Sequence, residues 1–191
     1  EYNVAVGNIA MDAASMTGNF NTAIGRSALG ANTSGSSNCA VGINVLGGNT
    51  TGNTNCAMGD SALDANTTGS NSVAIGVNAL GAATTADQNT ACGNIALNKV
   101  TTGASNAAFG GNAGGACTTG NGNAFIGDSA GYGNTTGYAN TFVGSAAGAY
   151  TVLTTTGTDN TMVGALSHAT SATAVNVNVF GRNVAGEQGY T

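Results

Sequence analysis

Residues 55–71 read NCAMGDSALDANTTGSN, and variants of this stretch recur along nearly the whole chain of 191 residues. Each copy has a short Asn-x-Ala-(Ile/Val/Phe)-Gly stretch, then Ala-Leu or Ala-Gly, then a turn of the Thr-Thr-Gly kind. The glycines that close the first part are separated by 18 residues, then seven times by 17, then by 20 and by 17. This constant period predicts a repeat architecture. The glycines are Gly7, Gly25, Gly42, Gly59, Gly76, Gly93, Gly110, Gly127, Gly144, Gly164 and Gly181.

The length of the repeat indicates what each copy builds. Seventeen residues hold two short strands and two corners, but neither a pair of helices nor a propeller blade. Glycine suits the corners, while the Gly, Asn and Thr content disfavours helix. We therefore expect an all-β fold, a parallel β-solenoid of about eleven 17-residue coils stacked about 4.8 Å apart. It should form a single domain over residues 1–191, with coils at 3–186, a longer irregular coil near 145–164 and a tail at 187–191.

Composition argues against several classes of function. Only 6% of the residues are charged, the formal net charge is −5, and the three basic residues, Arg26, Lys99 and Arg182, are far apart in sequence. We expect no nucleic-acid partner and, because the apolar runs are short, no membrane span. The single histidine, His168, has no convergent catalytic or metal-binding partners in the sequence. We therefore expect no enzyme, no cofactor and no metal site.

Alternation along the short strand suggests which side chains face inward, since successive strand residues point in opposite directions. The bulky residue before each glycine, such as Ile24 or Ile75, is expected to fill the coil. The residue before it should then face outward, and an outward apolar row marks an interface. We expect a homo-oligomer, with a parallel trimer favoured, joined through this row: Ala23, Ala40, Ala57, Ala74, Ala91, Ala108, Phe125, Phe142 and Met162.

A second apolar row changes in step with the first. It carries Leu29, Leu46, Leu63, Leu80 and Leu97, and then Gly114, Gly131 and Gly148. Over the same part of the chain, alanine in the first row is replaced by Phe125 and Phe142. Because lost leucine volume is offset by gained phenylalanine volume, we expect the two rows to share one packed layer.

Polar residues also recur at fixed positions. We interpret the main asparagine row as a structural ladder of stacked amides, with ligand binding as the alternative. The Thr-Thr rows are ordinary turn and β residues, or an array that binds ice. Four Asn-x-Ser/Thr matches begin at Asn32, Asn49, Asn66 and Asn134, and the repeat generates such matches automatically. The ladder comprises Asn21, Asn38, Asn55, Asn89, Asn106, Asn123 and Asn140, extended by Asn3 and Asn160 and interrupted by Ser72 and Val177.

Two of the four cysteines share one repeat position. Cys39 and Cys56 are 17 residues apart, so adjacent coils bring their Cα atoms to about 4.8 Å, within disulfide range. The sequence leaves two alternatives for this pair, a disulfide or two stacked free thiols. Cys92 takes the place of a core Ile or Val and is expected to be a small buried hydrophobe, while Cys117 lies in a turn and has no explanation at this level.

These motifs resemble two groups of fibrous proteins. Residues 71–76, NSVAIG, look like the repeat of trimeric autotransporter adhesin heads. The unit formed by residues 21–25, Ala28-Leu29 and residues 32–35 resembles the 17-residue repeats of phage tail-fibre proteins that carry an endosialidase-type chaperone. The resemblance implies a trimeric, left-handed parallel β-roll, located outside the cell on a virion tail or a bacterial surface.

The function expected from this resemblance is structural and adhesive. The chain would be a segment of an extracellular fibre, either a phage tail-fibre shaft or a bacterial surface adhesin or filament, presenting a rigid rod for attachment. Its partners would be copies of itself, also joined end to end in a filament, and an unknown host-surface or matrix receptor. The alternative is an ice-binding or other surface-binding solenoid that acts through its threonine rows.

Overall fold

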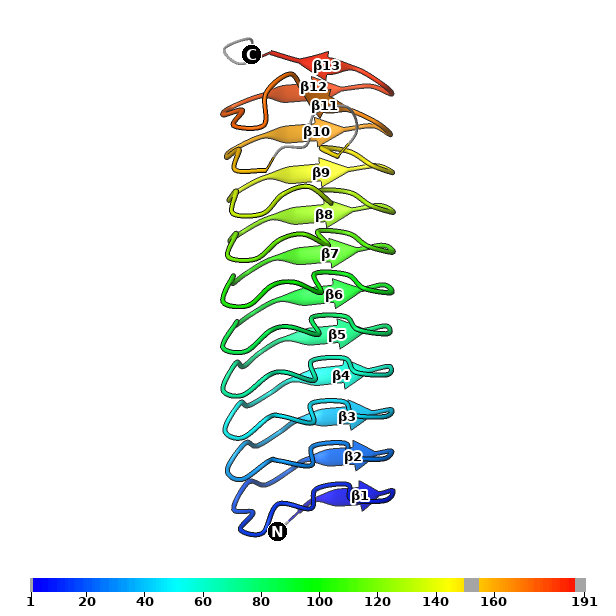
Figure 1. Ribbon diagram of the computed structural model, residues 1–191, viewed down its shortest axis with the longest axis vertical. Coiled ribbons are helices and arrows are strands. Elements are labelled where there is room, and N and C mark those ends of the chain that lie inside the picture. Colours follow the sequence, from blue (N-terminus) through cyan, green and yellow to red (C-terminus); the bar gives the residue numbers. More distant parts are fainter. Residues whose placement is uncertain (1, 150–154, 188–191) are drawn as a thin grey trace.

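The computed structural model describes residues 2–149 and 155–187, and it is an elongated stack of coils with the two termini at opposite ends (Figure 1). Across these described ranges all regular secondary structure is β-strand. The same residues contain no helix that is long and apolar enough to span a bilayer. The predicted all-β parallel solenoid is confirmed.

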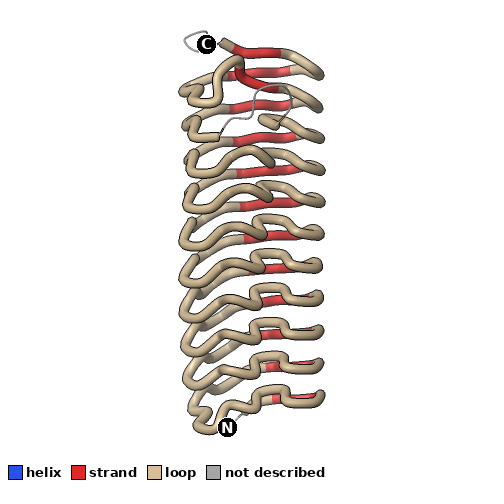
Figure 2. The backbone as a smooth tube through the Cα atoms, in the orientation of Figure 1, coloured by secondary structure: helices blue, strands red, loops and turns tan. Residues whose placement is uncertain are grey.

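Each coil contributes a three-residue strand to one side of the rod, and the rest of the coil is turn and loop (Figure 2). These strands form an 11-stranded parallel sheet in chain order, and β11 and β13 form a separate pair near the carboxyl end. The strands are β1 (Val4–Val6), β2 (Thr22–Ile24), β3 (Cys39–Val41), β4 (Cys56–Met58), β5 (Val73–Ile75), β6 (Thr90–Cys92), β7 (Ala107–Phe109), β8 (Ala124–Ile126), β9 (Thr141–Val143), β10 (Thr161–Val163), β11 (His168–Ala169), β12 (Asn178–Phe180) and β13 (Ala185–Gly186).

Strand register follows the sequence repeat. Ala57 pairs with Ala74 at the same position of the next coil, so identical positions stack into straight rows. Thr141 pairs with Thr161, which shows that the longer spacing near residues 145–164 is absorbed between β9 and β10 without breaking the rows. Residues 150–154 of that predicted longer coil and residues 188–191 of the predicted tail lie outside the described residues.

The structure has one strand in each regular coil, where we expected two. In the coil that contains β4, the residues Ser61, Leu63 and Asn71 have φ values of 54°, 51° and 60°. These left-handed residues interrupt the extended backbone, so the other walls of the coil are turns. The turns still stack, because the Leu63 N–H donates to the Ala79 carbonyl at 3.0 Å and the Thr50 N–H to the Thr67 carbonyl at 2.9 Å.

The interior of each coil is filled from two opposite walls. Leu63 projects from the turn wall and is 0% exposed, and Ala57 projects from the strand and is 1% exposed. The leucine leaves room for nothing larger than alanine on the strand, because the coil is narrow and close-packed. This corrects the expected orientation of the strand rows: the middle residue faces the coil's own interior, and the residue before the glycine faces out. The inward row is Ala23, Ala40, Ala57, Ala74, Ala91, Ala108, Phe125, Phe142 and Met162.

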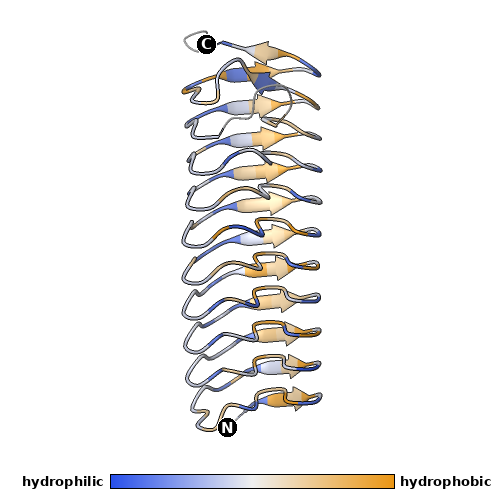
Figure 3. Cartoon of the chain, viewed as in Figure 1, coloured by the Kyte–Doolittle hydropathy of each residue, from blue (hydrophilic) through white to orange (hydrophobic). Residues whose placement is uncertain are grey.

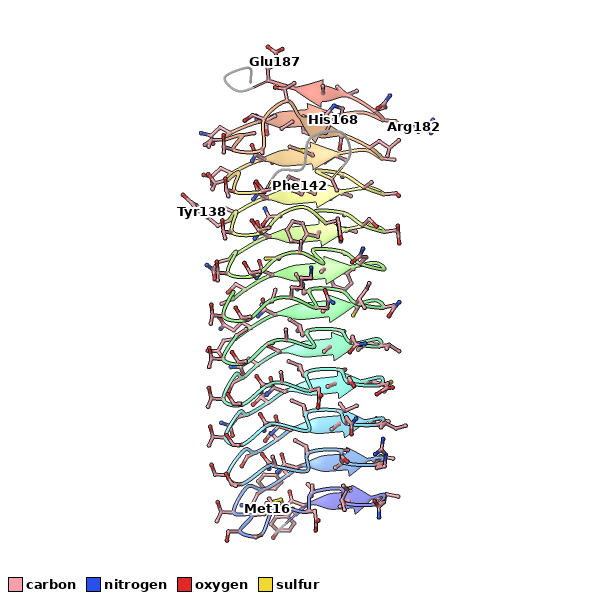
Figure 4. All side chains as sticks on the ribbon, viewed as in Figure 1. Met16, Tyr138, Phe142, His168, Arg182 and Glu187 are labelled. Carbon is pink, nitrogen blue, oxygen red and sulfur yellow. The ribbon has the colours of Figure 1, made fainter. Side chains whose placement is uncertain are left out.

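The exchange of Leu for Gly and of Ala for Phe occurs in this interior layer. A Cβ atom added to Gly114 would lie 2.6 Å from a ring carbon of Phe125, and one added to Gly131 would overlap the same ring. Gly148 stands in the same relation to the Phe142 ring. The two phenylalanine rings have centroids 5.7 Å apart, and Figure 4 shows Phe142 within the stack. The two rows therefore share one layer, as expected, but that layer lies within a single chain and is no subunit interface.

Candidate interaction surfaces

The residue before each corner glycine projects from the outer face of the sheet, and we call this set the outer apolar row. The large exposed side chains of this row have exposed fractions from 36% for Val163 to 69% for Phe180. Figure 3 shows the strands that carry it among the more hydrophobic parts of the rod. The row is Val6, Ile24, Val41, Met58, Ile75, Cys92, Phe109, Ile126, Val143, Val163 and Phe180.

The outer apolar row contains no polar member in any of the eleven stacked strands. With strands about 4.8 Å apart, it forms a straight stripe on the order of 50 Å long. Cys92 belongs to this row and pairs in register with Ile75 and Phe109, so the buried position expected for it is corrected to a half-buried one on the outer face. An exposed apolar stripe of this length is typical of interaction surfaces, so the outer apolar row is a candidate site.

The main asparagine ladder uses its amides within the rod. The Asn38 Nδ2 group donates to Oδ1 of Asn21 at 3.1 Å and to the Gly52 carbonyl at 2.9 Å, while Oδ1 of Asn21 also accepts the Asn38 backbone N–H at 3.0 Å. Ser72 continues the ladder by accepting the N–H of Asn89 at 3.2 Å. Because these asparagines are at most 1% exposed from Asn21 onward, their amide groups support the backbone and present nothing to a ligand.

A second asparagine ladder was missed in the sequence, although its members were visible as Asn-x-Ser/Thr matches. Asn32, Asn49, Asn66 and Asn134 are 0% exposed. The Asn49 Nδ2 group donates to Oδ1 of Asn32 at 2.9 Å and to the Gly52 carbonyl at 3.1 Å. These asparagines are thus enclosed by the coils, and the signal that could have revealed them is their fixed position three residues before the turn glycine.

Between Asn66 and Asn134, three consecutive coils carry Ala83, Val100 and Cys117 in place of this second asparagine. Where the ladder stops, Oδ1 of Asn66 and both amide atoms of Asn134 have no hydrogen-bond partner among the described residues. Cys117 is therefore a buried member of this row, and its turn position in the sequence is explained. Burial raises the pKa of the Cys117 thiol to about 11.

The two positions that are threonine in most turns have different roles. The hydroxyl of the first threonine donates a hydrogen bond to the next coil: Oγ1 of Thr50 donates to the Thr67 carbonyl at 3.0 Å. The second position is exposed in every described coil, and we call it the outer hydroxyl row. From Thr51 to Thr136 its hydroxyls make no hydrogen bond to another described residue. The row is Thr17, Ser34, Thr51, Thr68, Thr85, Thr102, Thr119, Thr136, Thr156 and Thr173.

Cys39 and Cys56 begin neighbouring strands and pair in register, and both are free thiols in the structure. Cys39 is half-buried and Cys56 is exposed. Burial raises the pKa of Cys39, and the neighbouring Cys56 raises it further by charge repulsion and by hydrogen bonding to the thiol. The structure therefore places the two sulfur atoms side by side on the outer face of the sheet.

His168 lies in β11, where its Nδ1 atom is 3.1 Å from the Leu166 carbonyl oxygen. Within residues 2–149 and 155–187 there is no group of three or more His, Cys, Asp or Glu side chains arranged to hold a metal ion. The same described ranges contain no detected pocket. The features that remain for recognition are the two surface rows and the cysteine pair.

Comparisons with the models of protein families, with curated proteins and with solved structures find no match to this chain.

Proposed function

We propose that this chain is a structural and adhesive segment of an extracellular fibre, a phage tail-fibre shaft or a bacterial surface adhesin or filament. In this proposal it works as a rigid rod for attachment, and copies of the chain assemble side by side as a homotrimer. The observation that carries the proposal is the outer apolar row, which runs without a polar interruption over all eleven strands of the sheet.

The energy available from covering this row supports assembly. A fully buried aliphatic side chain contributes about 1.5–3 kcal/mol, so a half-exposed member of the row gains about 1 kcal/mol when a copy covers it. Summed along the stripe, the gain is on the order of 10 kcal/mol before the entropy loss of association. One coil pair would not associate stably, but a long rod would.

The shape of the row favours copies of the same chain as its occupants. A straight stripe parallel to the rod axis can meet the same stripe of other rods around a common axis, which gives closed cyclic symmetry. The low charge of the chain, with a formal net charge of −5, opposes such contact only weakly. Three copies around the axis agree with the resemblance to trimeric fibre repeats.

Adhesion would use the sides of the rod that point away from this axis. The outer hydroxyl row lies on the turns, outside the strand face, and is exposed along the length of the rod. We propose that it and the neighbouring polar turns contact a host surface or matrix, while end-to-end stacking of rods extends the filament.

Assembly can be tested with a variant carrying Ile24→Asn, Ile75→Asn and Ile126→Asn. These side chains are 42–43% exposed and point out of the coil, so the variant should keep its β-sheet circular dichroism. Sedimentation equilibrium should find trimers of the parent chain and monomers of the variant. A matched control with Thr51→Asn, Thr102→Asn and Thr136→Asn in the outer hydroxyl row should remain trimeric. A stable monomer of the parent chain at micromolar concentration would contradict the proposal.

A second candidate is binding to ice or to another ordered surface. The observation that favours it is the outer hydroxyl row, which repeats with the spacing of the strands and has free hydroxyls from Thr51 to Thr136. Thermal hysteresis of the parent chain, lost when Thr68, Thr85 and Thr102 are changed to lysine, would favour this function. SDS-resistant trimers or long filaments without hysteresis favour the fibre.

A further inference from the structure

The strongest unassigned feature is the alignment of Cys39 with Cys56. Their strands, β3 and β4, are neighbours, and the register pairs the two residues directly. Adjacent strands lie about 4.8 Å apart, and disulfides span Cα distances of about 4.4–6.8 Å. Both side chains occupy the first strand position, flanked by the buried Ala40 and Ala57, so both project from the outer face.

The other two cysteines have no such arrangement. Cys92 pairs with Ile75 on one side and with Phe109 on the other. Cys117 is 0% exposed and takes the place of an asparagine in the second asparagine ladder. Within the described residues, Cys39 and Cys56 are thus the cysteine pair that the strand register aligns.

We propose that Cys39 and Cys56 form a disulfide that clips the third coil of the rod to the fourth. The two thiols together lose two protons and two electrons, and a low-molecular-weight disulfide such as oxidised glutathione accepts the electrons. The thiolate of one cysteine attacks this disulfide and releases one glutathione thiolate, and the resulting mixed disulfide is then attacked by the second cysteine, which releases the other. Cys56 is the exposed partner and is suited to the first attack, with Cys39 as the resolving thiol.

The clip has a specific mechanical role because of the solenoid architecture. Each coil contacts only its neighbours, so a rod can open locally between any two coils. A disulfide from Cys39 to Cys56 closes a loop one coil long and prevents separation at the β3–β4 step. It does so within one chain, so it goes beyond the proposed function and does not depend on assembly.

The test uses the full chain, reduced and unfolded, then refolded in a mixture of reduced and oxidised glutathione. Refolding makes the result independent of whether an assembled rod shields the thiols. Alkylation after denaturation should find two of the four cysteines blocked, and the intact mass should fall by two hydrogen atoms. Proteolysis after Leu46, which separates Cys39 from Cys56, should give peptides that remain joined until a reductant is added.

Matched variants identify the pair. Cys92→Ser with Cys117→Ser should still form the link, whereas Cys56→Ser should not; serine suits position 56 because this strand position holds Thr22 and Thr90 in other coils. Oxidation should raise the melting temperature of the chain by roughly 5–10 °C, and this shift should vanish in Cys56→Ser. Four titratable thiols after refolding would overturn the inference. Covalent dimers on a non-reducing gel would also overturn it, because they would mean that the cysteines pair between copies.

Discussion

At the scale of single residues, the strand alanines are small because another side chain already fills the space they face. Leu63 reaches across the coil from the opposite wall, and Ala57 completes the same layer. When the leucine position becomes Gly131, the strand residue becomes Phe125, whose ring occupies the vacated volume. Leucine at this position also has a positive φ of about 50°, which glycine adopts without strain.

This packing predicts that Phe125→Ala severely destabilises the rod. The ring lies against both Gly114 and Gly131, so its loss leaves a cavity that spans two coils. We expect the free energy of unfolding to fall by about 3–5 kcal/mol in guanidinium titrations. Tyr138→Ala is the matched control: Tyr138 is 53% exposed and projects away from the rod in Figure 4, so its loss should be under about 1 kcal/mol. Equal losses in the two variants would show that Phe125 is not a core residue.

The asparagine ladder gives a second prediction at this scale. Oδ1 of Asn106 accepts the Asn123 N–H at 3.0 Å, and its Nδ2 group donates to the Gly120 carbonyl at 2.8 Å. Asn106→Ala would leave these buried groups unpaired, which should lower the free energy of unfolding by about 2–4 kcal/mol. Asn106→Ser should lose roughly half as much, because Ser72 shows that a serine hydroxyl can accept the next coil's N–H. Chemical denaturation measures both, and indistinguishable losses would argue against ladder hydrogen bonding as the cause.

The orientation of the strand residues is where sequence reasoning went wrong. Ile24 and Ala23 are both apolar, so alternation alone does not tell which of them faces the interior. The larger side chain was assigned to the interior because burying more apolar area usually determines which side chain faces inward. Here the narrow width of the coil determines it instead. The exchange of Ala91 and Leu97 in one coil for Phe125 and Gly131 in another already indicated that both rows share one layer, and it was the signal that pointed to the observed arrangement.

At the scale of the coil, glycine at the strand corner sets how closely successive coils approach. Gly59 has a φ of 126°, and a Cβ atom added there would lie 2.7 Å from the backbone of Gly76 in the next coil. The sequence predicted these corners correctly from the constant spacing of glycine. It did not predict the left-handed turn residues such as Ser61, because serine has no intrinsic preference for that conformation and tertiary stacking imposes it.

A pair of glycine substitutions separates close approach from general flexibility. Gly59→Ala should lower the free energy of unfolding by at least about 2 kcal/mol, because it introduces backbone strain and a clash with the Gly76 backbone. Gly30→Ala should change it by less than about 1 kcal/mol, since the nearest atom to the added Cβ is the Ser27 carbonyl oxygen at 3.4 Å. Thermal melts followed by circular dichroism would compare them, and a neutral Gly59→Ala would contradict the stacking argument.

At the scale of the whole molecule, the period in the sequence was sufficient to predict the rod. The spacing of 20 residues between Gly144 and Gly164 also predicted the longer coil. The pairing of Thr141 with Thr161 shows that the rows continue across it. The exposed row was not predicted, because it depends on which wall fills the interior. The subunit contact that we propose is therefore the outer apolar row, Ile24 and its equivalents, and no longer Ala23 and its equivalents.

The nearest-neighbour nature of the rod predicts that one whole coil can be removed. Deletion of residues 56–72 joins Asn55 to Val73 and restores an Asn-Val-Ala-Ile-Gly stretch at the junction. Under reducing conditions this variant should fold with unchanged β-sheet circular dichroism per residue, and small-angle scattering should show a rod shorter by about 4.8 Å.

Deletion of residues 56–63 is the control, because it removes about half a coil and joins Asn55 to Asp64. The strand position would then receive Asp64, Ala65 and Asn66, and the rows on either side would no longer align. This variant should aggregate or lose cooperative unfolding, since slipped rows place polar groups in the interior. If the whole-coil deletion were equally damaged, stability would have to come from contacts beyond adjacent coils, which a one-dimensional stack does not provide.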